Sequence, residues 1–265
     1  MITMQKHLEE QAFRLITIPI SHYCEKARWA LERLEINYIE EPHPPLFHRL
    51  ATSQSGGGTS VPVLVTEKDT FSDSTKILQY LDQITTVSQK LYPSEPNQRH
   101  KVDKLENLFN TQLGPSTRLW FYSYLLDNRE LILRLFCEGV KPVEQKIFTV
   151  VFGSIQQAMR QKLNITAESA ASSVDKIKRI FATVNERLAD GRTYLVGNSF
   201  SAADLTFACL AAPTVLPTEY GVRVPQLEEL PSEMAATIRE LRETPSGKYA
   251  MRLFREERRP RHQLS

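Results

Sequence analysis

The segment Phe13-Arg14-Leu15-Ile16-Thr17-Ile18-Pro19-Ile20-Ser21-His22-Tyr23-Cys24 joins an apolar run to a polar helix start. The apolar run at residues 13–20 predicts a buried strand, and the apolar residues at 27, 30, 31 and 34 then recur at helical spacing. Ser21 is therefore expected where a strand turns into a helix, beside unpaired backbone N–H groups and the positive end of the helix dipole. Such a position can stabilise an anion.

Two further segments have the same character. Val61-Pro62-Val63-Leu64 predicts the start of a strand, and Ser72-Asp73-Ser74-Thr75 predicts the start of a second helix. Each places polar groups or free backbone at the end of an element. Together with the first segment, they predict one site for a small anionic ligand within one compact domain.

The chain resembles the cytosolic glutathione transferases over nearly its whole length. In that family S-x-x-C replaces the C-x-x-C of glutaredoxins, a Val-Pro with a cis bond begins the third strand, and an acidic-Ser pair opens the third helix. The matching residues here are Ser21 with Cys24, then Val61-Pro62, then Asp73-Ser74, and the segment 197–204 is similar to the capping box of the family's helical domain. The resemblance implies an α/β thioredoxin-like domain followed by an all-α helical domain, with glutathione as co-substrate.

The domain organisation follows from the proline- and glycine-containing segments that separate the predicted strands and helices. Residues 1–88 are predicted to form the thioredoxin-like glutathione-binding domain, residues 89–98 a Pro-containing linker, and residues 99–265 an all-helical domain that carries the acceptor-substrate pocket. Helical spacing is found at residues 98–113, 117–126, 142–163, 170–188, 202–212 and 232–257. Gly114-Pro115 is expected to kink or break the first of these helices.

Composition limits the classes of function. A net charge of +2 gives no reason to expect nucleic acid or an acidic membrane as a partner. Three separate cysteines suggest neither a disulfide framework nor a metal cluster, and they fit a reducing compartment. The mixed, charged start at residues 1–14 does not resemble a signal peptide, and no apolar run reaches the ~18 residues of a membrane span. We therefore expect a cytoplasmic protein without a metal, and a solvated helix end at the arginine-rich residues 252–262.

The resemblance assigns the chemistry to Ser21, whose hydroxyl would stabilise the thiolate of glutathione. The same serine would also serve as an ordinary helix cap. Cys24 is the competing nucleophile, but glutaredoxins carry their reactive thiol at the first position of the motif, which is serine here. Cys24 is thus expected to be a small buried apolar residue.

The other predicted site residues are expected to bind glutathione and not to react with it. With a cis bond before Pro62, Val61 would present its N–H and C=O to the peptide backbone of the ligand. Asp73 and Ser74 would receive the γ-glutamyl end, Ser74 and the helix start holding its carboxylate and Asp73 meeting its ammonium. The family often has a basic or amide side chain just before Val-Pro, whereas this chain has Ser60 at that position. Gln54 or Arg49 is therefore the candidate to hold the glycyl carboxylate instead.

An acceptor pocket is expected where the helical domain faces Ser21. The aromatic cluster at residues 120–124 lies just beyond the Gly-Pro pair, with Arg118 beside it. Because these aromatic residues cannot all face one way on a helix, only one or two should touch a ligand. Arg118 and Tyr122 are the predicted pocket residues.

The preferred function is a glutathione transferase that conjugates the thiolate to a small hydrophobic electrophile, as in detoxification. Family resemblance also implies a two-fold homodimer. Two other functions remain open at this stage. One is a glutathione-dependent thiol reductase or lyase that works through Cys24. The other is a non-catalytic relative that binds a ligand or another protein.

Overall fold

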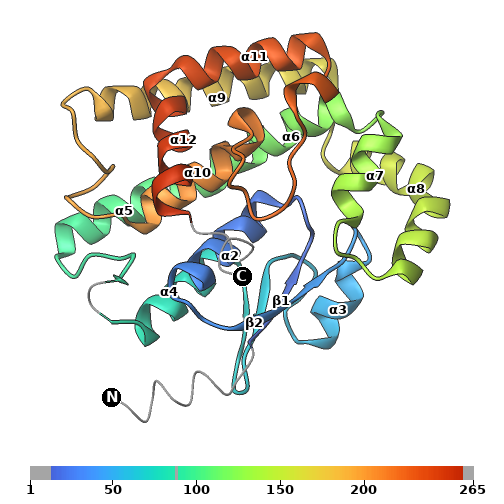
Figure 1. Ribbon diagram of the computed structural model, residues 1–265, viewed down its shortest axis with the longest axis horizontal. Helices are drawn as coiled ribbons and strands as arrows, with labels where there is room; N and C mark the ends of the chain where they lie inside the picture. Colours follow the sequence, from blue (N-terminus) through green and yellow to red (C-terminus); the bar gives the residue numbers. More distant parts are fainter. Residues whose placement is uncertain (1–12, 87–88, 259–265) are drawn as a thin grey trace.

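The computed structural model describes residues 13–86 and 89–258 of the 265. The charged start at residues 1–12 and the last part of the arginine-rich tail, residues 259–265, lie outside the described residues. The chain builds a small mixed sheet flanked by helices and then a larger helical part (Figure 1).

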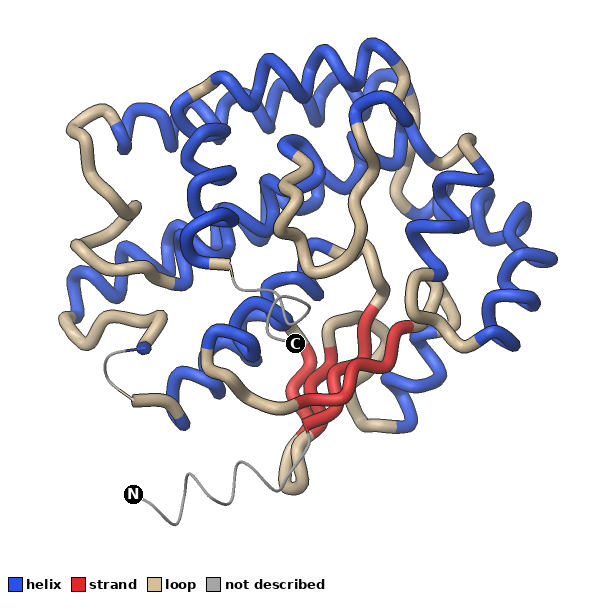
Figure 2. Tube along the Cα trace, in the orientation of Figure 1, coloured by secondary structure: helices blue, strands red, loops and turns tan. Residues whose placement is uncertain are grey.

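A four-stranded sheet organises the first part. Its strands are β1 (Phe13–Thr17), β2 (Tyr38–Pro42), β3 (Val63–Val65) and β4 (Thr70–Ser72), in the spatial order β2-β1-β3-β4. β1 runs parallel to β2, whereas β3 is antiparallel to both β1 and β4. The strands gather at one side of the molecule beneath the helices (Figure 2).

Three helices flank this sheet. α2 (His22–Arg33) and α4 (Ser74–Ile84) lie on one face, and α3 (His48–Gln54) lies on the other (Figure 1). Trp29, Ala30 and Leu31 of α2 and Ile77, Leu78 and Leu81 of α4 are fully buried. This sandwich confirms the predicted thioredoxin-like arrangement, with a parallel β1–α2–β2 unit followed by an antiparallel pair and a helix.

The elements that follow are helical throughout. They are α5 (Pro96–Leu108), a π-helical turn (Phe109–Leu113), α6 (Gly114–Leu125), α7 (Arg129–Cys137), α8 (Pro142–Lys162), α9 (Ala167–Leu188), α10 (Ala202–Val215), a 3₁₀ turn (Leu227–Glu229), α11 (Ser232–Glu243) and α12 (Pro245–Glu257). α10 is buried on almost every side, as expected for a helix that is apolar all round. The Asp204 carboxylate accepts hydrogen bonds from the Ser201 N–H (2.8 Å) and hydroxyl (2.7 Å), which confirms the capping role of this pair.

The helical boundaries differ from the sequence prediction in three places. α7 was not predicted, and residues 232–257 form two helices because Thr244 caps a new helix that has Pro245 in its first turn. At Gly114-Pro115 the chain stays helical. The expected break is replaced by a π-helical turn, Phe109–Leu113, which lies just before Gly114. Proline is tolerated in the first turn of a helix, where its missing N–H has no acceptor.

α2 is buried on its charged side as well as its apolar side. Lys26 of α2 pairs with Glu106 of α5 (Nζ to Oε1, 3.2 Å), and Arg28 pairs with Glu40 of β2 (Nη2 to Oε1, 2.7 Å). Arg258, just after α12, is also buried, and its Nε lies 2.7 Å from Glu25 Oε1. The expectation of a solvated tail is therefore wrong at this residue, because two buried carboxylates of α2, Glu25 and Glu32, attract it.

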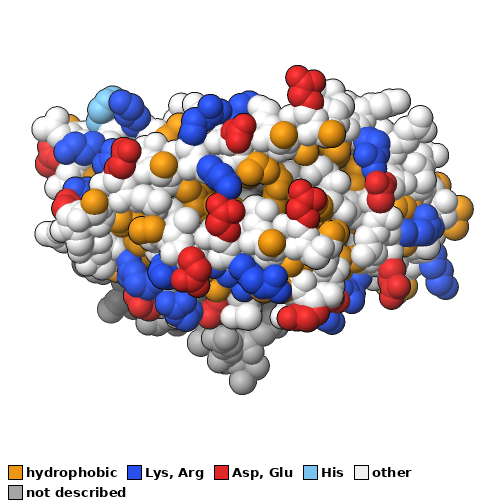
Figure 3. Space-filling model, turned by 90° about the horizontal axis from the view of Figure 1, so that it is seen from above, with side chains coloured by type: hydrophobic (Ala, Val, Ile, Leu, Met, Phe, Trp, Pro, Cys, Tyr) orange, Lys and Arg blue, Asp and Glu red, His pale blue; other side chains and the backbone are white. Residues whose placement is uncertain are grey.

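The surface offers no single-sign patch on the face over α9 and α11, where basic and acidic side chains are interspersed (Figure 3). Within residues 13–86 and 89–258, no helix combines the length and the apolar character needed to cross a membrane.

Candidate functional site

Strand register brings the three predicted site segments to one edge of the sheet. Ile16 near the end of β1 pairs with Val63 at the start of β3, and Val63 pairs with Ser72 at the end of β4. The start of α2, the Val61-Pro62 loop and the start of α4 therefore lie next to one another. The Asp73 N–H donates to the Pro62 carbonyl oxygen at 3.4 Å, which ties two of these segments together.

Ser21 lies at the N-cap position of α2 with extended backbone angles. Its Oγ accepts a long hydrogen bond from the Cys24 N–H at 3.4 Å, and its side chain is partly exposed. The loop before it is held by Arg28, whose Nη2 donates to the Pro19 carbonyl oxygen at 2.9 Å. The hydroxyl therefore occupies a fixed, solvent-accessible position at the positive end of α2.

Cys24 lies one turn further along α2 and is completely buried. Burial raises the pKa of the Cys24 thiol to about 11, although the Arg28 charge and the Ser21 hydroxyl oppose that rise. The thiolate is the reactive form of cysteine, so a thiol with this pKa is nearly all protonated at neutral pH. This environment agrees with the expectation that Cys24 is a small buried core residue.

Asp73 caps α4 in an unusual backbone conformation. Its φ of 96° is rare for a residue with a side chain, and its Oδ1 accepts from the N–H groups of Thr75 (2.8 Å) and Lys76 (3.3 Å). Among the described residues, none donates a hydrogen bond to Oδ2. Asp73 is exposed, whereas the adjacent Ser74 is 3% exposed.

The bond between Val61 and Pro62 is cis, which confirms the prediction made from the sequence. Pro62 is buried and Val61 is half-buried. No described residue forms a hydrogen bond with the Val61 backbone, so its N–H and C=O are available to an extended ligand. Ser60 is exposed, and the alternative residue Arg49 lies in α3 with its Nε buried and without a partner among the described residues.

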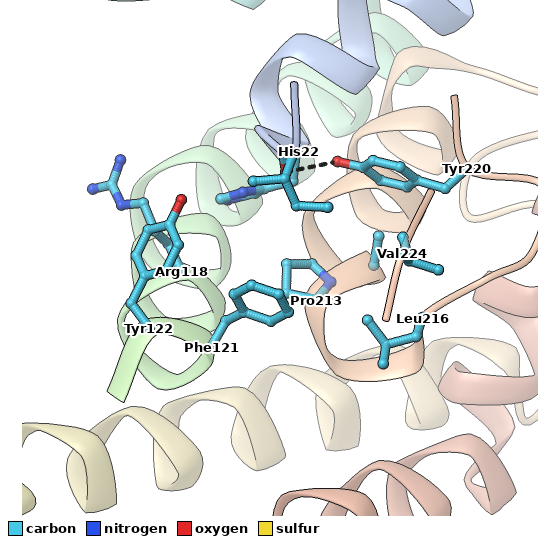
Figure 4. A pocket seen from close by; sticks show the side chains of 10 residues that line it. His22, Arg118, Phe121, Tyr122, Pro213, Leu216, Tyr220 and Val224 are labelled. Atoms are coloured by element: carbon cyan, nitrogen blue, oxygen red, sulfur yellow. Dashed lines mark hydrogen bonds between the residues drawn. The ribbon is translucent and has the colours of Figure 1, made fainter. Parts of the chain in front are cut away.

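A narrow cleft lies where the start of α2 faces α6 and the end of α10. Ile20 and His22, the two neighbours of Ser21 in the chain, line it, and Figure 4 shows His22 across from Phe121 and Pro213. Its empty space, including the open mouth, is about 350 Å³. The other lining residues are Arg118, Phe121, Tyr122, Ala212, Pro213, Leu216, Tyr220 and Val224. The cleft thus places an apolar chamber next to the Ser21 end of α2.

Two family models cover more than half of the chain. The model of the glutathione S-transferase N-terminal domain matches residues 15–88, and that of the C-terminal domain matches residues 166–241. The chain belongs to the glutathione transferase family. The N-terminal model covers the part of the chain that forms the sheet, and the C-terminal model lies within the helical part.

Solved structures that share the fold include two glutathione transferases and Ure2p. The enzyme from Methylobacterium radiotolerans, in complex with glutathione sulfonate, is 18% identical with a TM-score of 0.55, and the match covers 91% of this chain and 94% of that one. The theta class enzyme from Xanthomonas axonopodis pv. citri, with glutathione bound, is 17% identical with a TM-score of 0.55, covering 91% and 97%. Ure2p in complex with S-hexylglutathione is 14% identical with the same TM-score, covering 91% and 98%. No curated protein sequence matches significantly.

In this member of the glutathione transferase family the aromatic cluster of α6 is divided between two sides of the helix. Phe121 and Tyr122 line the cleft together with Arg118. Trp120 and Tyr124 instead face a separate hollow between α6 and α9, because residues two positions apart on a helix point in different directions. The cluster as a whole is therefore not the pocket lining.

Sequence reasoning missed the part of the cleft formed by residues 212–224. Pro213 inside α10 and Leu216, which ends α10 in a left-handed conformation, turn the chain so that Tyr220 reaches the start of α2. The Tyr220 hydroxyl donates to the Ile20 carbonyl oxygen at 3.2 Å. A proline near the end of an apolar helix was the available signal, but it did not reveal which element the loop would meet.

His22 contributes a neutral ring to the cleft. Burial, reinforced by the Arg118 charge, lowers the pKa of His22 to about 3. Its Nε2–H donates to the Gly114 carbonyl oxygen at 3.0 Å, which orients the ring toward α6. Tyr23 also holds α2 against the helical part, since its hydroxyl donates to the Asn110 carbonyl oxygen at 2.7 Å.

Proposed function

We propose that this protein is a glutathione transferase in which Ser21 stabilises the glutathione thiolate for attack on a small hydrophobic electrophile. The observation that carries the proposal is the position of Ser21 at the start of α2, next to the cleft and with Cys24 buried behind it. Family membership supports glutathione as the co-substrate.

The energy required of Ser21 is modest. A free thiol has a pKa of about 8.5, so half ionisation at neutral pH needs roughly 2 kcal/mol in favour of the anion. A hydrogen bond from a hydroxyl to a charged partner contributes about 1.5–3 kcal/mol. The helix end adds about 0.3–1 kcal/mol. One serine donor at this position therefore suffices, and Ser21 need not be deprotonated.

The other contacts would position the tripeptide. The free backbone groups of Val61, before cis-Pro62, suit antiparallel pairing with the cysteinyl part of glutathione. The unused Oδ2 of Asp73 suits the γ-glutamyl ammonium, and Ser74 with the start of α4 suits its carboxylate. Arg118 and Tyr122 would border the acceptor. A two-fold homodimer in the cytoplasm remains a prediction from the family, and light scattering tests the dimer.

A thiol reductase or lyase that works through Cys24 is less well supported. Such a reaction needs a thiolate that can reach a disulfide, whereas Cys24 is buried and its pKa is raised to about 11. A non-catalytic binding protein differs from the proposed enzyme only in what happens after glutathione binds. Conjugation assays therefore decide between these two.

The test combines calorimetry with glutathione, conjugation assays on a panel of electrophiles, and the variant Ser21→Ala. We expect Ser21→Ala to bind glutathione, to lower kcat/KM by one to three orders of magnitude, and to raise the pKa of the bound thiol. Thr166→Ala is the matched control, because it also removes a helix N-cap side chain, at the start of α9. An unchanged thiol pKa in Ser21→Ala would exclude the assigned role, and absence of binding at millimolar glutathione would exclude the function.

A further inference from the structure

Arg118 is a cation without a counter-ion at the edge of an apolar cleft. Among the described residues, no carboxylate lies within ion-pair distance of it, and its side chain makes no hydrogen bond. Its Nε is shielded from solvent without a partner. The two buried arginines, Arg28 and Arg258, by contrast each form ion pairs with two glutamates. A partly buried charge is normally paired, so this guanidinium is suited to an anion from outside the chain.

Tyr122 provides a second unused donor beside Arg118. The two residues are four positions apart on α6 and lie side by side in Figure 4, where the Arg118 guanidinium is turned away from Pro213 and Leu216, at the rim of the cleft. Burial raises the pKa of Tyr122 to about 12, so its hydroxyl keeps its proton at neutral pH. Within the described part of the chain, this hydroxyl has no hydrogen-bond partner.

The other polar groups of the cleft are already engaged. His22 donates to Gly114 and Tyr220 donates to Ile20. Since His22 is neutral, Arg118 is the one charged group among the described residues that line the cleft. Phe121, Pro213 and Leu216 form the apolar remainder, which suits an aromatic or similarly flat body.

We propose that the acceptor substrate is a hydrophobic electrophile carrying a carboxylate, which Arg118 and the Tyr122 hydroxyl hold at the edge of the cleft. Arginine presents a planar fork that matches a carboxylate, and a phenol adds a third donor. This inference rests on the proposed function, because it names the substrate class of the same site. It makes Arg118 and Tyr122 specificity-determining residues.

The test compares two acceptors that differ in one group, 4-chloro-3-nitrobenzoate and 4-chloro-3-nitrobenzamide. In each reaction the glutathione sulfur bonds to the ring carbon that bears chlorine, the carbon–chlorine bond breaks, and chloride leaves with the bonding pair. The thiol proton passes to solvent. Each kcat/KM is divided by the uncatalysed rate constant, which removes the different intrinsic reactivity of the two rings.

We expect the wild-type protein to favour the benzoate, and Arg118→Gln to lower the benzoate-to-benzamide ratio by about tenfold to a hundredfold. Tyr122→Phe should lower the ratio severalfold. Arg239→Gln is the control, since Arg239 is an exposed arginine on α11, and it should leave the ratio unchanged. An unchanged ratio in Arg118→Gln, or an equal loss on both acceptors, would overturn the proposal.

A binding measurement separates this inference from the proposed function. Calorimetry with the unreactive pair 3-nitrobenzoate and 3-nitrobenzamide reports the anion site without any conjugation. If the protein conjugates no electrophile of the panel, these two included, but binds 3-nitrobenzoate in a manner that Arg118→Gln abolishes, the enzyme assignment fails and the carboxylate site stands. If binding of the two nitro compounds is equal and independent of Arg118, the site itself is refuted.

Discussion

Lys26 of α2 and Glu106 of α5 form an ion pair that is almost completely shielded from solvent, with 3.2 Å between Nζ and Oε1. Glu106 also accepts hydrogen bonds from Thr75 of α4 (2.8 Å) and Tyr92 (2.9 Å). One carboxylate thus joins α2 and α4, the two helices that carry the proposed glutathione site, to the helical part.

We predict that Lys26→Met lowers the free energy of unfolding by about 3–5 kcal/mol, because it leaves Glu106 buried without its cation. Urea denaturation measures this. Asp103→Asn is the control, since it breaks an exposed pair with Arg99 and should cost less than about 1 kcal/mol. The double variant Lys26→Met with Glu106→Gln should recover part of the loss, and a Lys26→Met protein as stable as wild type contradicts the prediction.

The charge of Asp73 is predicted to hold the γ-glutamyl ammonium. Asp73→Asn keeps the cap of α4 and tolerates its positive φ, so stability should change little while glutathione affinity falls about tenfold. An analogue of glutathione without the α-amino group should bind both forms equally in calorimetry. Glu95→Gln is the matched control, because Glu95 is an acidic N-cap of α5. Equal loss for glutathione and the analogue would show that the charge has another role.

Cys24→Ala should retain conjugation activity within about threefold, since a buried thiol whose pKa is about 11 supplies almost no thiolate. In the wild-type protein, iodoacetamide should label Cys24 only after urea is added, which mass spectrometry of the peptides reports. A glutathione-dependent activity that disappears in Cys24→Ala would establish the reductase or lyase instead.

His22 makes the stability of the fold sensitive to acid. Its pKa is lowered to about 3 in the folded protein, whereas the unfolded chain binds the proton near pH 6.5. Between these values the unfolded state holds more protons, so stability is present above pH 6.5 and is lost as the pH falls. The loss from this residue should reach about 2 kcal/mol at pH 5.

Urea denaturation at a series of pH values checks this prediction. His22→Gln should reduce the slope of unfolding free energy against pH between 7 and 5, whatever its effect on stability at pH 7. His100→Gln, at an exposed position, should leave the slope unchanged. The same slope in His22→Gln and wild type would contradict the assignment.

The site segments were predictable because the features that define them are local. A serine at a helix start, an acidic cap and a Val-Pro pair at a strand start can each be read within four residues. Arg118 and Tyr122 line the cleft, and their role toward an acceptor stays a prediction. Trp120 and Tyr124, from the same aromatic cluster, face a separate hollow. Helical spacing tells which residues share a face, not which neighbour that face will meet.

The sequence by itself determined the thioredoxin-like order of elements, the helical second part and the starts of α2 and α4, since periodicity and capping act over a few residues. Tertiary structure alone decided that the charged side of α2 is buried and that Arg258 pairs with Glu25, 233 residues away in the chain. It also decided that Tyr220 closes the cleft. Burial of a charge is favourable only when a partner arrives from elsewhere in the fold, and no local pattern contains that information.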